Sequence, residues 1–148
     1  MTSGIGAWGV YLPFWRLERK AIGAALGGPS GRGTRTGASY DEDTTTLGVE
    51  AGRRALEVPG GWTPDQVLFS SPEPAYQDKT NATTVHAALG LPQRVAAFDM
   101  VGSVRSAVGA LVTAVATADR TPTLAVLADI RTGLAGGADE RDSGDGAV

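Results

Sequence analysis

The stretch from Arg94 to Asp119 combines a short apolar run, a polar turn and a long run rich in alanine and valine. This order predicts a strand over Val95–Phe98, a tight turn over Asp99–Gly102 and a helix from Ser103 onward. No linker separates the three elements. The turn therefore lies at the N-terminus of the helix, where free backbone N–H groups and the helix dipole favour negative charge.

Enzymes of several folds place a nucleophile at such a turn, because the same N–H groups can hold an oxyanion. The candidates in this chain are Ser103, Val104 and Ser106. None of them is an obvious nucleophile.

The predicted helix is apolar around most of its circumference. Between Val104 and Ala118 the only charged residue is Arg105, and the large apolar side chains are Val108, Leu111, Val112 and Val115. A surface helix shows a single apolar stripe, whereas a helix that is apolar nearly all round is buried on several sides. We therefore expect cover on two faces, of which one sheet of this chain supplies one.

The rest of the chain alternates between strand and helix patterns. Strands are predicted at Val10–Pro13, Val67–Ser71 and Thr123–Ala128. Helices are predicted at Leu17–Leu26 and Asn81–Leu89, and a further helix is predicted to begin after Asp43 or Thr44 as its N-cap. The final residues, GDGAV, resemble the start of another strand. The alternation predicts an α/β domain with a largely parallel sheet and helices on both faces, and it is compatible with an antiparallel strand at one edge.

The length of 148 residues corresponds to one domain, over residues 1–148. No apolar run is long enough to span a bilayer, and the N-terminus lacks the pattern of a secretory signal, so we expect a cytoplasmic protein without a membrane partner. A net charge of −3 without a basic cluster argues against nucleic acid.

The chain has no cysteine and one histidine, His86. These counts exclude disulfides, a thiolate nucleophile and the usual zinc ligand sets, and no metal is expected. On its predicted helix, His86 is expected to be packed or hydrogen-bonded rather than catalytic.

Two local motifs have competing interpretations. GIGAWG, over residues 4–9, matches a dinucleotide-binding pattern, but it precedes a predicted strand instead of following one, so a nucleotide role is not favoured. The Gly-rich segment Gly27–Ser39 carries Arg32 and Arg35, which could clamp a phosphate or coenzyme A. The alternative is a solvated surface loop.

Acidic residues occur at three places. Asp41, Glu42 and Asp43 precede a helix pattern, where capping explains them better than acid/base catalysis or metal binding. Glu73 directly follows a predicted strand, which makes it a candidate general base or a solvated loop residue. In the tail, the spacing from Asp139 to Asp145 matches no calcium loop and favours a turn.

In chain order, the motifs GIGAWGVYLPFWRL, YDEDTTTLGVEAGRRAL, LFSSPEPAYQDKTNATTVHAALGLP, AFDMVGSVRSAVGAL, LAVLADIR and SGDGAV cover nearly the whole sequence. Together they resemble the N-terminal half of thiolase-superfamily enzymes, within the group of hydroxymethylglutaryl-CoA synthase and relatives near β-ketoacyl-ACP synthase III. The resemblance implies half of a five-layer αβαβα sandwich, with the helix after the nucleophile between two sheets. The half that carries the family's histidine and its histidine or asparagine partner is absent from these residues.

The resemblance also implies roles for individual residues. The family's cysteine stands five residues after the aspartate that corresponds to Asp99, and Val104 occupies that position, so no acyl-enzyme can form there. Ser103, one position away, is a weak alternative. Glu73 lies near the family's general acid/base glutamate, at a slightly different spacing, and Arg32 and Arg35 fall in the loop that helps to receive coenzyme A.

Two functions are consistent with these residues. The first is an acyl-CoA enzyme of lipid metabolism that makes or breaks a C–C bond without a cysteine acyl-enzyme, with a coenzyme A thioester as substrate. The second is a non-catalytic scaffold that forms a homodimer or a hetero-complex with an acyl-CoA enzyme, a second thiolase-like chain or an OB-fold/zinc-ribbon protein. In either case we expect no activity from the 148 residues alone.

Overall fold

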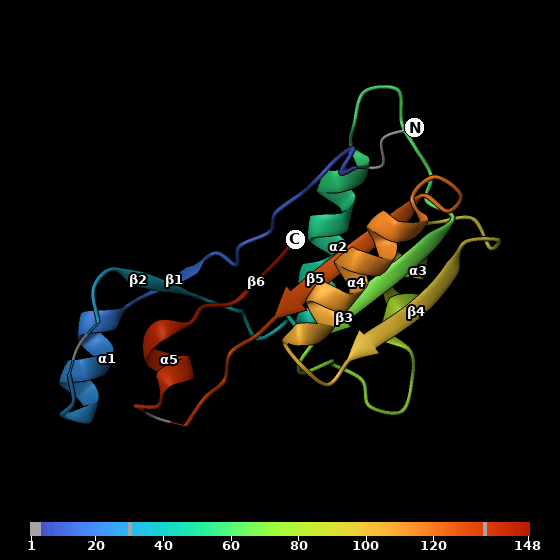
Figure 1. Cartoon of the computed structure of the whole chain (residues 1–148). Helices are drawn as coiled ribbons and strands as arrows, with labels where there is room; N and C mark the ends of the chain where they lie inside the picture. Colours follow the sequence, from blue (N-terminus) through green and yellow to red (C-terminus); the bar gives the residue numbers. More distant parts are fainter. Residues whose placement is uncertain (1–3, 30, 135) are drawn as a thin grey trace.

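A computed structural model describes residues 4–29, 31–134 and 136–148. Its centre is a four-stranded sheet in the order β4-β3-β5-β6 (Figure 1). The bounds of these strands are Gln66–Ser71 for β3, Ala96–Val101 for β4, Thr123–Asp129 for β5 and Gly146–Ala147 for β6. β3 pairs in parallel with both β4 and β5, whereas β6 pairs antiparallel to β5. The predicted α/β class and largely parallel sheet are confirmed.

Helices cover both faces of the sheet (Figure 1). The helices α2 (Thr44–Leu56) and α3 (Asn81–Ala88) lie on one face, and α4 (Arg105–Thr117) lies on the other. The core between the sheet and the first two helices contains the fully buried side chains of Leu47, Phe69, Val85 and Val126. Because successive strand side chains point to opposite faces, Val67 and Phe69 pack on α2 and α3 while Leu68 and Ser70 lie under α4.

The start of α2 follows the predicted capping pattern. Asp43 is the N-cap, its carboxylate accepts a hydrogen bond from the Thr46 backbone N–H at 2.7 Å, and the Thr46 hydroxyl accepts one from the Asp43 N–H. Two of the otherwise unpaired backbone donors at the helix start are thereby satisfied.

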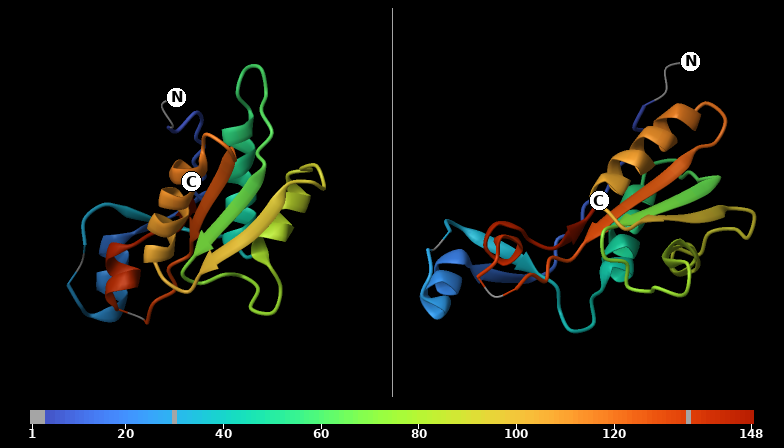
Figure 2. Two further views of the ribbon diagram at one scale, coloured as in Figure 1. Left: turned by 45° about the vertical axis from the view of Figure 1, so that its right-hand side comes forward. Right: turned by 60° about the horizontal axis from the view of Figure 1, so that its bottom comes forward.

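A second group of elements projects from one end of the sheet (Figure 2). It contains the antiparallel pair β1 (Trp15–Glu18) and β2 (Thr34–Gly37), the helix α1 (Arg19–Leu26) and the short helix α5 (Ala138–Asp142). A buried ion pair joins β2 to the C-terminal segment: the Arg35 guanidinium lies 3.1 Å from the Asp145 carboxylate.

Several predicted boundaries are wrong. The predicted loop over Gly27–Ser39 contains β2, and the predicted helix start at Leu17 falls within β1. β4 continues through the predicted turn to Val101, because its pairing with β3 extends to the partners Ser71 and Val101.

The predicted first strand, Val10–Pro13, is also wrong as an element of the sheet. Only Tyr11 pairs there, in an isolated antiparallel bridge with Ala147. Since β6 is two residues long, it offers the N-terminal segment little backbone to pair with. The predicted strand in GDGAV is confirmed as β6.

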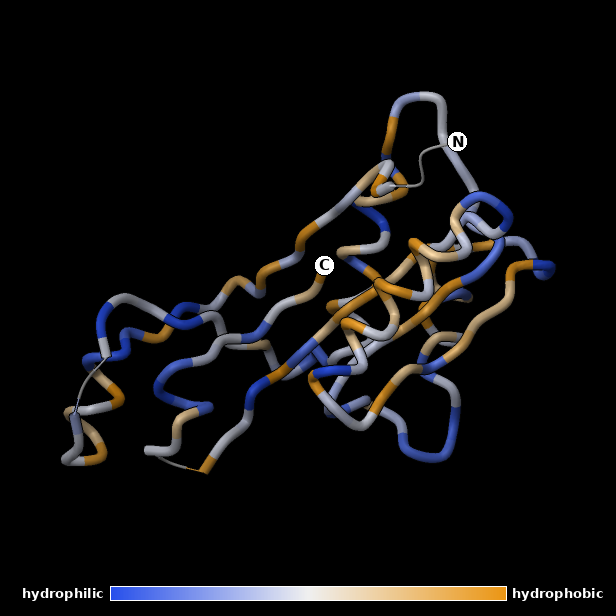
Figure 3. Tube along the Cα trace, in the orientation of Figure 1, coloured by the Kyte–Doolittle hydropathy of each residue, from blue (hydrophilic) through white to orange (hydrophobic). Residues whose placement is uncertain are grey.

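Helix α4 is covered by the sheet on one side only. Among its described residues only Ala110 is buried, whereas Val104, Val108 and Val112 are each more than half exposed. Figure 3 shows that the helix is apolar along most of its length. The described residues do not supply the second cover that the sequence analysis predicts.

In the described part of the chain, no helix is both long and apolar enough to cross a membrane.

Gly9 packs against the backbone of α2, and this contact generates a prediction. A Cβ at Gly9 would lie 2.4 Å from the Ala51 carbonyl oxygen and 2.6 Å from the Ala55 nitrogen. Gly9→Ala is therefore expected to lower the free energy of unfolding by about 1–3 kcal/mol, as measured by urea denaturation. Gly6→Ala is the matched control, because nothing lies within 4 Å of its Cβ. Equal stability of the two variants would contradict the packing role of Gly9.

Candidate functional site

A polar pocket of about 520 Å³ lies at the carboxyl edge of the sheet. It lies between the N-terminus of α2, the loop after β3 and the residue after β5, and it is lined by Glu42, Asp43, Thr44, Pro72, Glu73, Pro74, Ala75, Gln77 and Ile130. Ligands of open α/β sheets bind outside the carboxyl ends of the strands. The predicted acid/base residue Glu73 therefore lies in a suitable place.

The backbone of Glu73 is held while its side chain is exposed. The Thr44 hydroxyl donates to the Glu73 carbonyl oxygen at 3.3 Å and accepts from the Ala75 N–H at 3.1 Å. Ser71 Oγ accepts from the Glu73 N–H at 3.1 Å. Thr44 is 2% exposed, so a buried hydroxyl ties the Glu73 loop to the first turn of α2.

A second anchor holds the far end of the same loop. Asn81 Oδ1 accepts from the Tyr76 N–H at 3.0 Å, and Asn81 Nδ2 donates to the Tyr76 carbonyl oxygen at 2.9 Å. The same amide nitrogen donates to Asp99 at 2.9 Å. Asn81 is 1% exposed, so a buried side chain holds this end of the loop.

Asp99, on β4, closes this network by capping α3. Its two carboxylate oxygens accept from the backbone N–H groups of Asn81 at 2.8 Å and Ala82 at 2.6 Å. The N-cap residue of α3, Thr80, makes no capping bond with its own side chain. The anion at the helix N-terminus therefore comes from a neighbouring strand, where it also interacts favourably with the helix dipole.

The pKa of the Asp43 carboxyl, at the rim of the pocket, is lowered. Burial by itself raises it, but the hydrogen bonds from the Thr45 hydroxyl and from the Thr46 backbone and hydroxyl outweigh burial. Asp43 is thereby held in its ionised form as a cap. The pattern matches the capping role predicted for the acidic cluster.

The turn before α4 places Val104 at the helix N-terminus. Val104 is the N-cap residue and is 57% exposed. Ser103 Oγ accepts from the Arg105 N–H at 3.1 Å, so the hydroxyl caps the helix in place of Val104. Gly102 has a φ of +99°, which an L side chain rarely adopts, and its N–H donates to the Ser71 carbonyl oxygen at 3.3 Å.

The two candidate positions follow neighbouring strands. Glu73 comes two residues after Ser71, Ser103 comes two residues after Val101, and Ser71 and Val101 are register partners. Across the described residues, no hydrogen bond links Glu73 to Ser103 or Val104. The structure thus gathers an exposed carboxylate and a helix N-terminus at one edge of the sheet without joining them.

Arg32 and Arg35 have different surroundings. Arg32 is exposed, whereas Arg35 is 8% exposed and donates to Asp145 and to the carbonyl oxygens of Arg131 and Glu140. The Arg35 guanidinium is largely occupied within the protein. Its coenzyme A role remains a prediction, and the geometry favours Arg32 as the residue free to meet a phosphate.

The other polar candidates have structural surroundings. His86 Nε2 lies 3.1 Å from the Pro92 carbonyl oxygen. Asp145 accepts from the backbone N–H groups of Ala38 and Arg131, each at 2.8 Å. Over residues 4–29, 31–134 and 136–148, no cluster of histidine and acidic side chains could hold a metal ion.

Sequence reasoning missed the two anchors of the Glu73 loop. Thr44 was a candidate N-cap, and Asn81 was only the first residue of a predicted helix. Each acts on the loop through a tertiary contact, which local spacing does not reveal. The one available signal was a polar residue at the start of each predicted helix.

Asn81 provides a test of the loop anchor. Asn81→Ala leaves the Tyr76 N–H and carbonyl groups without their partner and removes one of the three hydrogen bonds to Asp99, and it is expected to lower the free energy of unfolding by about 1.5–3 kcal/mol. Amide exchange should show the loss of protection at Tyr76 and Ala82. Gln77→Ala, at an exposed position of the same loop, is the control and should change neither quantity. Unchanged exchange at Tyr76 in the Asn81 variant would refute the anchor.

Known proteins resemble this chain in both sequence and fold. The chain is 32% identical to the hydroxymethylglutaryl-CoA synthase of Methanocella arvoryzae over 152 aligned positions, which cover 93% of this chain and 43% of that enzyme. It thus spans less than half the length of this relative. A comparison with profiles of known protein families finds no match.

Solved structures match nearly the whole chain. A crystal structure of HMG-CoA synthase complexed with CoA superposes with a TM-score of 0.86 at 22% identity, over 99% of this chain and 40% of that one. The 3-oxoacyl-(acyl carrier protein) synthase III of Pseudomonas aeruginosa superposes with a TM-score of 0.84 at 22% identity, over 99% of this chain and 49% of that one. The fold and the sequence relatives agree: the chain has a thiolase-like fold and is related in sequence to the hydroxymethylglutaryl-CoA synthases.

Proposed function

We propose that residues 1–148 form one half of a thiolase-fold protein that makes or breaks a C–C bond of a coenzyme A thioester without a cysteine acyl-enzyme. The observation that supports this proposal is that the pocket around Glu73 and the helix N-terminus at Val104, the position to which the resemblance assigns the nucleophile, lie at one edge of the sheet. The solved relatives match over 40–49% of their own length, which supports the assignment as a half.

Val104 limits the chemistry that this half can perform. A thioester intermediate needs a thiolate, and valine has no atom that can attack a carbonyl carbon. Ser103 carries the neighbouring hydroxyl, but its oxygen caps α4, and among the described residues no hydrogen bond joins it to a basic side chain. We therefore assign this half to chemistry that needs no covalent intermediate.

Aldol cleavage or its reverse fits these groups. For cleavage of a 3-hydroxyacyl thioester, Glu73 takes the proton of the hydroxyl group, whose oxygen becomes a carbonyl as the C–C bond breaks. The bonding electrons move to the thioester enolate, and the N–H groups at Ser103 and Val104 stabilise its oxygen. The enolate carbon then takes a proton, which Glu73 can return.

Coenzyme A is the proposed carrier of the acyl group. One of the structural relatives was crystallised with CoA. In this chain the exposed Arg32 is the proposed contact for a phosphate of the carrier. Arg35 supports it by fixing β2 against the C-terminal segment through Asp145.

A non-catalytic scaffold is the second candidate, and the exposed face of α4 favours it. Val104, Val108 and Val112 form a stripe at four-residue spacing, and Phe98 on β4 is also more than half exposed. Such a contiguous apolar surface marks an interaction site. Its proposed occupants are a second copy of this chain, the other thiolase-like half, or an acyl-CoA enzyme or OB-fold/zinc-ribbon protein. A cytoplasmic place in lipid metabolism fits both candidates.

The catalytic role of Glu73 can be tested on the assembled protein. The isolated chain is expected to be inactive, and its mass by light scattering should show a dimer that V112K converts to monomer. In the assembly that turns over hydroxymethylglutaryl-CoA, E73Q should lower kcat by about 10²–10⁴-fold without changing the mass. E57Q, at an exposed carboxylate after α2, is the control.

Two results would separate the candidates. Undiminished turnover in E73Q would overturn the catalytic role of Glu73. An assembly that binds its partner through α4 but cleaves no acyl thioester would establish the scaffold function instead.

The nucleophile position can be tested separately, because the natural chain has no cysteine. V104C places a single thiol at the N-terminus of α4, where its pKa should fall below the ordinary value of about 8.5. The rate of alkylation by iodoacetamide against pH gives this pKa. V112C, with 62% exposure in the middle of the same helix, is the matched control. Equal pKa values for the two thiols would contradict the placement of Val104 at an activating helix terminus.

A further inference from the structure

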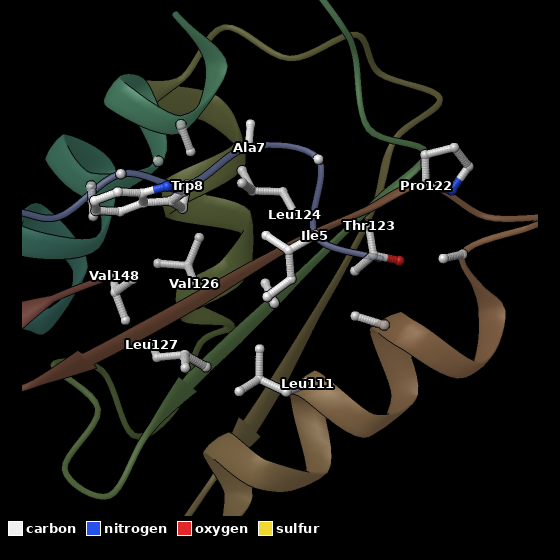
Figure 4. Close-up of a pocket in the computed structure, with 18 of the residues that line it drawn as sticks. Ile5, Ala7, Trp8, Leu111, Pro122, Thr123, Leu124, Val126, Leu127 and Val148 are labelled. Carbon is white, nitrogen blue, oxygen red and sulfur yellow. The ribbon is translucent and has the colours of Figure 1, made fainter. Parts of the chain in front are cut away.

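Two cavities of the chain offer no cation to a phosphate group. Acidic and uncharged residues line the Glu73 pocket. A second cavity, of about 420 Å³, lies between β5 and the N-terminal segment, residues 4–9 (Figure 4), and no charged side chain of the described residues lines it. The phosphates of coenzyme A therefore need a cation from elsewhere. The projecting elements β1, β2, α1 and α5, which we call the arm, carry the exposed Arg32.

The arm is joined to the sheet beside the Glu73 pocket. Ile130, which follows β5, lines that pocket. The carbonyl oxygen of the next residue, Arg131, accepts a hydrogen bond from the Arg35 guanidinium of β2 at 2.9 Å. In coenzyme A, a long pantetheine chain separates the thioester from the phosphates. This separation is compatible with a thioester at the pocket and phosphates on the arm.

Arg19, the first residue of α1, holds the backbone on one side of Arg32. Its N–H donates to the carbonyl oxygen of Gly33 at 3.0 Å. Gly33 has a φ of +73°, in the region that favours glycine. The residue after Arg32 is thereby tied to the start of α1.

The side chain of Arg19 is held in turn at the end of α5, which lies beside α1 (Figure 1). Its guanidinium donates to the carbonyl oxygens of Arg141, Asp142 and Ser143, the last at 3.0 Å. The last carbonyl groups of a helix have no partner within the helix and lie at the negative end of its dipole, so a guanidinium stabilises them. Arg19 therefore bridges α1 and α5.

Gly31 packs on this bridging side chain. A Cβ at Gly31 would lie 3.1 Å from the Cδ atom of Arg19 and 3.6 Å from the carbonyl oxygen of Arg141. Gly31 and Gly33 flank Arg32, so the residues on both of its sides contact Arg19. The Arg32 side chain itself stays exposed.

We propose that Arg19 is a positioning residue for phosphate binding, a role that rests on the coenzyme A carrier proposed above. It fixes the backbone on both sides of Arg32, so that the Arg32 guanidinium is presented to a phosphate of the carrier. A loop that is ordered before binding loses less conformational entropy when the ligand binds, which raises the affinity. Arg19 acts through Arg32, because its own guanidinium already donates to three carbonyl groups.

Titration calorimetry of coenzyme A with the assembled protein tests this role. R32A should raise Kd by about tenfold or more, because charge-assisted hydrogen bonds to a phosphate are lost. R19M keeps an unbranched side chain without donors and should raise Kd by about threefold or more. The double variant R19M/R32A should bind no more weakly than R32A, since the two residues act as one unit. K20M removes the same charge from the next, exposed residue and should change Kd by less than about twofold.

Gly31 provides a second variant that leaves the donors of Arg19 in place. G31A should also weaken coenzyme A binding, because its Cβ meets the Arg19 side chain. G28A is the matched control in the same glycine-rich segment, since nothing lies within 4 Å of a Cβ at Gly28.

A nitroxide label tests the positioning without coenzyme A. The chain has no cysteine, so R32C accepts a single label. Adding R19M should narrow its electron paramagnetic resonance spectrum as the label becomes more mobile, whereas adding K20M should not. An unchanged spectrum with R19M, or a double variant that binds more weakly than R32A, would overturn the role of Arg19 and leave the carrier proposal intact. A parent protein that binds no coenzyme A would overturn the carrier proposal, and the role of Arg19 with it.

Discussion

The candidate site depends on the hydrogen bonds that the Asp99 carboxylate accepts. Asp99 lies on β4, and its carboxylate accepts three hydrogen bonds from the start of α3. One of them comes from the side chain of Asn81, which also binds the backbone of the loop that carries Glu73. A strand, a helix and a loop are thereby fixed to one another by a single, partly buried polar network. Such networks stabilise a unique arrangement when every member is satisfied. The same strand continues to Val101, so the N-terminus of α4 is placed relative to Glu73 by the same framework.

The described residues combine a connected polar network with two apolar surfaces. One is the face of α4 around Val108, and the other is the cavity between β5 and the N-terminal segment. Among the described residues, no element covers the first surface, and mostly apolar side chains line the second. The chain matches less than half the length of two solved relatives.

Much of the fold was predictable because it follows from local spacing. The Asp43 cap, the apolar periodicity of α2 and the runs that form β3 and β5 depend on residues within one or two turns of each other. The predicted boundaries are wrong where an element depends on pairing with residues far away in the sequence. Val10–Pro13 has the composition of a strand, but the strand beside it, β6, is only two residues long. Arg35 has the sequence context of a loop arginine, but its contact with Asp145, 110 positions away, lies in the interior of the protein.

By itself, the sequence determined the α/β class, the absence of any cysteine and the apolar character of the Val108 helix around most of its circumference. These features follow from the types and spacing of residues that lie close together in the chain. The tertiary structure alone decided that Thr44 and Asn81 hold the Glu73 loop, that Asp99 caps a helix from a neighbouring strand, and that an apolar cavity lies beside β5. Those features are made by groups far apart in the chain, and only the pairing of the strands brings them together.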